Sequence, residues 1–184
     1  MEIAQFFQTI KIPMTVAHVI AVVFGMGGAL MSDLLFSFFS KAKKLNDTQI
    51  STLSILSKVV LFGLIFIILS GMAIFLSDPV KYMNSAKFLA KMSILLILLI
   101  NGYVLNRVVW PHVSSQEFFI SKKSKLRQLA FACGAISVIS WLSTCTLGVL
   151  NRVSLSYFNI MSIYLIILLF GITIALLVEK KEFK

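Results

Sequence analysis

Five long apolar runs, separated by segments rich in Lys, Pro, Ser and Asn, constrain this 184-residue chain more than any other feature. Each run is close to 20 residues long, which is the length that a helix needs to cross a hydrocarbon core of about 30 Å. The predicted spans are 16–39, 58–76, 88–109, 129–150 and 157–178. With 59% hydrophobic and only 13% charged residues, the chain is expected to be all-α: one polytopic helical bundle over residues 1–184.

The ends of two spans carry helix signals of their own. Residues 1–13 have apolar side chains on one helical face, which predicts a short interfacial helix ended by Pro13. The segment Asn46–Thr48 is a cap signal, so the second helix is expected to begin in water and to enter the membrane near Lys58. Ser85 is expected to cap the third helix.

The distribution of basic residues predicts the orientation. Four lie on the side of the N-terminus: Lys11, Lys81, Lys87 and Arg152. Twelve lie on the other side: Lys41, Lys43, Lys44, Lys58, Arg107, Lys122, Lys123, Lys125, Arg127, Lys180, Lys181 and Lys184. The richer side is expected to be cytoplasmic, which places the N-terminus outside and the C-terminus inside. The formal charge of +10 then indicates contact with anionic lipids on the cytoplasmic side. A nucleic-acid partner is not expected, because the sequence contains no motif that reads a DNA or RNA groove.

Ionisable residues inside the spans are costly, so they are the candidates for function. The first span, "VAHVIAVVFGMGGALMSDLL", holds His18 near its outer end and Asp33 about 22 Å further in. Lys91 lies about one turn below the outer end of the third span, so His18 and Lys91 are expected at one depth. Asp33 similarly shares an inner polar layer with Asn101, Asn106 and Arg107.

Helical phase points the same residues toward the protein. His18, Gly25, Ala29 and Asp33 fall on one face of the first helix, and Ala21, Gly25 and Ala29 form a small-xxx-small series. The second helix offers Ser70–Gly71, and the fourth offers Ser140, Thr144 and Gly148. The expected ligand-binding set, between the first and third helices, is His18, Lys91, Gly25, Gly28 and Ser70.

Each residue also has a simpler interpretation, and the alternatives stay open at this point. Lys91 would extend to the outer surface or hold an anionic ligand, and His18 would be a hydrogen-bonded structural residue, a metal or haem-iron ligand, or a proton carrier. Asp33 would pair with Arg107 or Lys58, or act in a proton or cation relay.

The fourth span carries no catalytic signature. Cys133 and Cys145 are expected to be unbridged apolar residues, and "SWLSTCTLG" to form interhelical hydrogen bonds.

The segment "HVIAVVFGMGG" resembles the first helix of the HemJ-type protoporphyrinogen oxidases and, more loosely, of CopD-type copper-resistance membrane proteins. His18 and Gly28 match the family's histidine and the glycine ten residues later, and Lys91 matches a lysine in a later helix. The resemblance implies a tetrapyrrole such as haem b between the helices, with His18 as iron ligand and Lys91 near a propionate or the substrate. The wider pattern "H…GMGGALMSDLLF…SG…SAKFLAKM…NG" is similar to a group of bacterial five-helix membrane proteins, which implies the bacterial inner membrane.

Three functions follow as hypotheses. The first is binding of haem, another tetrapyrrole or another anionic redox ligand at the outer site, with membrane oxidoreductase activity implied by the resemblance. The second is a small-solute or ion/proton transporter whose inner gate involves Asp33, Asn101 and Asn106. The third is a structural subunit of a larger membrane complex, with His18 and Lys91 as packing residues. A homodimer or a partner in a membrane complex is expected alongside the lipids.

Overall fold

The computed structural model describes residues 2–40, 45–113, 118, 125–150 and 153–183. These residues are helical and contain no β-strand. The elements are α1 (Glu2–Thr9), α2 (Lys11–Phe39), α3 (Asp47–Ser77), α4 (Pro79–Met83), α5 (Ala86–Val104), the π-helical η1 (Leu105–Val109), the 3-10 turn η2 (Trp110–His112), α7 (Lys125–Val149) and α8 (Tyr157–Glu182). Five helical segments are long and apolar enough to cross a membrane, which confirms the prediction of an all-α chain with five spans.

The long helices extend beyond the predicted spans because their caps lie outside the apolar runs. At the start of α3, the Asn46 side chain accepts from the Gln49 N–H at 2.8 Å, and the Gln49 side chain accepts from the Asn46 N–H at 3.0 Å. This capping box confirms the predicted early start of the second helix. Ser85 accepts from the Phe88 N–H at 3.3 Å and begins α5, as expected.

The break between α1 and α2 does not lie where the sequence predicted. It comes at Ile10, and Pro13 lies in the first turn of α2. The prediction that Pro13 ends the first helix was wrong, because the first-turn N–H groups of a helix have no intrahelical acceptor and a proline is tolerated there. α1 packs on the far end of α3, where the Gln8 amide donates to the Ser77 carbonyl at 3.3 Å.

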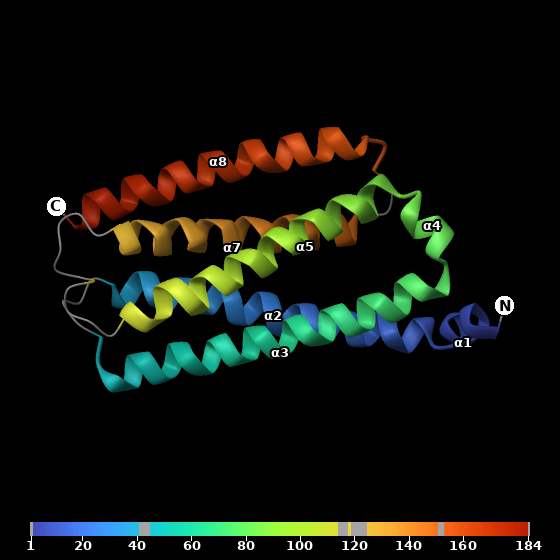
Figure 1. Cartoon of the computed structure of the whole chain (residues 1–184), viewed down its shortest axis with the longest axis horizontal. Coiled ribbons are helices and arrows are strands. Elements are labelled where there is room, and N and C mark those ends of the chain that lie inside the picture. Colours follow the sequence, from blue (N-terminus) through green and yellow to red (C-terminus); the bar gives the residue numbers. More distant parts are fainter. Residues whose placement is uncertain (1, 41–44, 114–117, 119–124, 151–152, 184) are drawn as a thin grey trace.

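The bundle consists of a helix pair, α2–α3, joined through α7 to α5 and α8. α2 packs along α3 and also meets α7, whereas α5 packs on α7 and α8 (Figure 1). The predicted pairing of the first and third helices is therefore indirect, because α7 contacts both. Side chains of α5 still reach the central core, in which Leu98 joins Ala21, Ile67 and Trp141.

The buried residues of α2 are Ala21, Gly25, Gly28 and Ala29, which confirms the predicted small-residue face. The two chain ends lie at opposite ends of the bundle (Figure 1), as five spans require. Which end faces the cytoplasm stays a prediction from the charge count. Seven of the residues in that count lie outside the described part of the chain: Lys41, Lys43, Lys44, Lys122, Lys123, Arg152 and Lys184.

Candidate functional site

The first polar cluster lies between α2 and α3 near the α1 end of the bundle. Its hydrogen bonds indicate which ring nitrogen of His18 carries the hydrogen. The Nδ1 atom of His18 is 3.0 Å from the Ser70 Oγ. The Ser70 hydroxyl has one hydrogen, which it donates to the Phe66 carbonyl at 2.5 Å. Ser70 must then accept from the His18 Nδ1–H, so the Nε2 atom of a neutral His18 carries the lone pair.

The imidazole of His18 is held against the backbone of α3. A Cβ atom at Gly71 would lie 3.4 Å from the His18 Cε1, so a larger residue there would press on the ring. Ser70 is buried, and His18 is half-buried. The Ser70–Gly71 pair that sequence analysis singled out on the second helix therefore fixes the ring.

Lys91 reaches this region from α5. Its side chain is half-buried, and its Nζ would be 3.8 Å from a Cβ atom at Gly148 of α7. It is close enough for its positive charge to interact with His18 and with Cys145 of α7. The structure therefore brings the charge of Lys91 within range of His18, and α7 packs against both of their helices.

Gly25 and Gly28, also in the expected ligand-binding set, lie at helix contacts. A Cβ atom at Gly25 would be 2.8 Å from the Trp141 Cη2, and one at Gly28 would be 3.2 Å from the Val60 Cγ2. Their role in the structure is to let α3 and α7 approach α2.

The expected inner polar layer separates into two parts. Asp33 and Asn101 face the interior: Asn101 is 6% exposed, and its Nδ2 donates to the Cys133 carbonyl at 3.0 Å. Asn106 and Arg107, in contrast, are exposed.

The expected ion pair of Asp33 with Arg107 or Lys58 does not form, because neither basic group lies within 4.0 Å of the carboxyl in the described structure. The carboxyl of Asp33 faces α7 instead: its Oδ1 would be 3.6 Å from a Cβ atom at Gly134, and Ser137 is a neighbour.

Sequence analysis missed a buried ion pair at the C-terminal end of the bundle. The Nε of Arg127 on α7 is 2.7 Å from the Glu179 Oε1 on α8, and the two side chains are 1% and 4% exposed. The Arg127 guanidinium also donates to the Phe118 carbonyl and lies 3.8 Å from the centre of the Phe183 ring. The signal that could have indicated Glu179 is its position directly after the last predicted span, which ends at residue 178.

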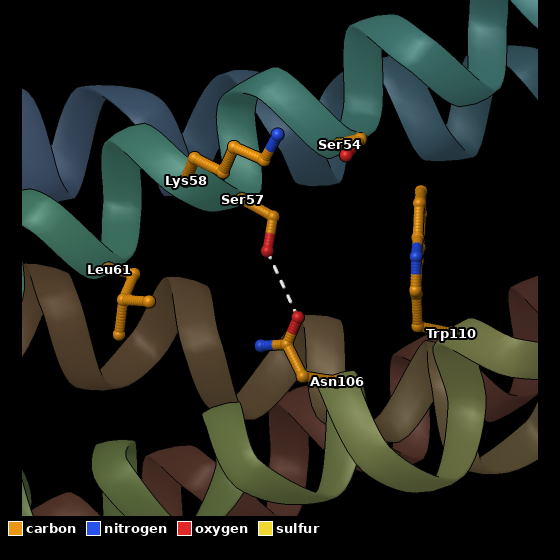
Figure 2. Close-up of a pocket in the computed structure, with 6 residues that line it drawn as sticks. All are labelled: Ser54, Ser57, Lys58, Leu61, Asn106 and Trp110. Atoms are coloured by element: carbon orange, nitrogen blue, oxygen red, sulfur yellow. Dashed lines mark hydrogen bonds between the residues drawn. The ribbon is translucent and has the colours of Figure 1, made fainter.

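A pocket of roughly 210 Å³ lies between α3 and the segment that follows α5 (Figure 2). The Ser57 hydroxyl donates to the Asn106 Oδ1 at 3.0 Å across it. Asn106 belongs to the π-helical η1, and such π turns are often found at functional sites. The residues that line the pocket are Ser54, Ser57, Lys58, Leu61, Asn106 and Trp110. Of these, only Asn106 was expected at a site.

Other predictions concern the side chains of α7. Cys133 and Cys145 are both free thiols, as expected. The Ser140 Oγ lies 2.9 Å from the Tyr164 hydroxyl of α8, which confirms an interhelical hydrogen bond from "SWLSTCTLG". The described residues include no group of three or more His, Cys, Asp or Glu side chains that could hold a metal ion.

Comparisons with protein-family models, with curated protein sequences and with solved structures find no match to the chain.

Proposed function

We propose that the outer polar site binds a planar, anionic redox ligand of the haem type, held by His18 and Lys91. The observation that carries the proposal is the hydrogen bond from His18 Nδ1–H to Ser70, which leaves Nε2 free. Imidazoles that bind metals usually donate their other N–H in this way, which fixes the tautomer and the ring plane.

His18 and Lys91 would supply the two kinds of group that hold a haem, a nitrogen ligand and a positive charge. His18 offers the Nε2 lone pair, and the ammonium of Lys91 offers a positive charge for a propionate. In the described residues, no carboxylate lies within 4.0 Å of Lys91 to neutralise it, so an anionic ligand would supply that charge. A bound haem would supply one-electron chemistry, while this chain would orient the ring and keep it in a mostly apolar setting.

Absorption spectroscopy of the full-length protein, purified from haem-sufficient cells, tests the proposal. We expect a Soret band that is lost in His18→Ala and kept in His112→Ala, which alters an exposed histidine at the opposite end of the bundle. Lys91→Met should weaken haem retention more than Lys87→Met does. A colourless wild-type protein, or a band of full intensity in His18→Ala, would contradict the assignment.

The setting proposed for this activity is the bacterial inner membrane. The five apolar helices support a multi-pass membrane protein. The resemblance of the first helix and the excess of basic residues on one side support the choice of membrane and orientation. Anionic lipids on the cytoplasmic side, and a second copy or a complex partner, are the partners proposed with it.

A second candidate function is transport of a small ion or proton. The observation that favours it is the presence of two polar clusters, around His18 and around Asp33, with an apolar layer that includes Ile67, Leu98 and Trp141 between them. Single cysteines along α2 test it, in a background without Cys133 and Cys145. Transport predicts labelling by water-soluble reagents at both polar levels, whereas labelling only at the helix ends would count against it.

A further inference from the structure

Two oxygen atoms in the interior of the bundle have no hydrogen-bond partner. They are the Asp33 Oδ2 on α2 and the Asn101 Oδ1 on α5, and no other buried side-chain nitrogen or oxygen of the described residues shares this property. Buried polar atoms are nearly always satisfied, since leaving one without a partner is costly. With Asp33 ionised, both atoms can only accept, so the group that satisfies them must be positive or must donate hydrogen.

The two oxygens belong to side chains that flank the same turn of α7. Asn101 binds the Cys133 carbonyl through its Nδ2. The next residue, Gly134, has no side chain, and a Cβ atom there would lie 3.6 Å from the Asp33 Oδ1. Ser137, one turn further along α7, is close enough for its hydroxyl to interact with the same carboxyl. One turn of α7 thus brings together a carboxylate, an amide oxygen and a hydroxyl.

The charges in this region limit what can bind. Among the described residues, no basic group lies within ion-pair distance of Asp33, and the buried Arg127 of α7 forms an ion pair with Glu179. A single carboxylate balances one positive charge, whereas a divalent ion would leave an excess charge inside the membrane. Carboxylate, amide and hydroxyl oxygens are hard ligands of the kind that bind hard cations.

We propose that Asp33, Asn101 and Ser137 bind a monovalent hard cation of the Na⁺ class in the inner half of the bundle. The site is separate from the outer cluster around His18, and the inference does not rest on the haem proposal. Binding would tie α2, α5 and α7 together, and α7 packs against both of the other helices.

Binding of ²²Na⁺ to the detergent-purified full-length chain tests the proposal. We expect saturable binding that unlabelled NaCl displaces and choline chloride does not. Asp33→Asn should abolish it, and Asn101→Leu should weaken it at least about tenfold. Asp47→Asn makes the same chemical change at an exposed residue of α3 and should bind as the wild type does. At saturating NaCl, we also expect the wild-type melting temperature to rise by about 5–10 °C above its value in choline chloride.

A gain of function distinguishes a binding role from a structural one. Asn101→Asp adds a second carboxylate, so its preference should move from Na⁺ toward Ca²⁺, a change that a purely structural asparagine would not produce. His18→Ala should bind Na⁺ normally, which separates failure of this site from failure of the haem proposal. The inference is overturned if the wild type shows no saturable binding, if Asp33→Asn binds as well as the wild type, or if Asp33 affects only the response to pH.

Discussion

Gly63 of α3 lies directly against the backbone of Gly25 of α2. A Cβ atom at Gly63 would be 2.7 Å from both the Cα and the N of Gly25, and 3.1 Å from the Ala21 carbonyl oxygen. This close approach also sets the register of the antiparallel pair. His18 lies seven residues before Gly25 (25 − 18), and Ser70 lies seven residues after Gly63 (70 − 63), so the two reach the same level. The contact between Gly25 and Gly63 thereby positions the hydrogen bond between His18 and Ser70.

Substitution of Gly63 by Ala should destabilise the bundle by about 1–3 kcal/mol, because the added methyl group meets backbone atoms and α2 and α3 must separate. Gly27→Ala is the matched control, since a Cβ atom there would have nothing within 4 Å. It should be neutral or slightly stabilising. Reversible unfolding in mixed micelles measures both free energies of unfolding, and equal stability of the two variants would show that the contact is looser than described.

The tautomer of His18 should depend on Ser70. In Ser70→Ala the Nδ1–H loses its acceptor, so we expect the imidazole ¹⁵N signals of His18 to change from those of an Nδ1–H tautomer to those of a mixture. Solid-state NMR of protein labelled in histidine measures this, with His112 as the internal reference. If the protein binds haem, the same variant should hold it about 10–100-fold less tightly. A spectrum identical to that of the wild type would mean that another group fixes the ring.

The length of the apolar runs predicted the five long helices, and the small residues of the first run predicted the face on which α2 packs. The hydrocarbon core requires helices of a given length, and Ala21, Gly25 and Ala29 form the face on which helices pack closely. The partner of Asp33 could not be predicted in the same way. Depth and phase give the level and direction of a side chain, but the neighbour depends on the order of the helices, and Asp33 meets α7.

The depth of the polar residues in the third span did not show which of them face the interior. At 100° per residue, Asn106 and Arg107 already lie about 140° and about 120° from Asn101, in opposite directions, so they are exposed while Asn101 is buried. Beyond Val104 the chain also continues as a π-helix, which turns less per residue than an α-helix. The sequence carries no signal that would have revealed this change of pitch.

The hydroxyl of Tyr164 should contribute to the packing of α8. It forms a buried hydrogen bond with Ser140, whose side chain is 0% exposed, so Tyr164→Phe leaves an unsatisfied hydroxyl on α7. We expect a loss of about 1 kcal/mol in the free energy of unfolding. Tyr103→Phe removes a hydroxyl from a side chain that is 66% exposed and should cost nothing measurable. Equal values for the two variants would mean that Ser140 finds another partner.

The ion pair between Arg127 and Glu179 should be the most sensitive polar contact of the bundle. Both side chains are nearly inaccessible, so Glu179→Gln removes the carboxylate that lies 2.7 Å from the buried guanidinium, and Arg127→Met removes the guanidinium from the buried carboxylate. Each single change should cost about 3–5 kcal/mol. Arg127→Lys should not restore stability, because lysine cannot reproduce the planar stack over Phe183.

The double variant Arg127→Met, Glu179→Gln measures the interaction free energy between the two side chains. We expect it to be more stable than the sum of the two single losses predicts, by about 1–3 kcal/mol, because neither charge is then left alone. Lys125→Met, at an exposed basic residue in the same turn of α7, should change the free energy of unfolding by no more than about 0.5 kcal/mol. Strictly additive losses would mean that Arg127 and Glu179 stabilise the protein independently, through the Phe118 carbonyl and the Phe183 ring instead of through each other.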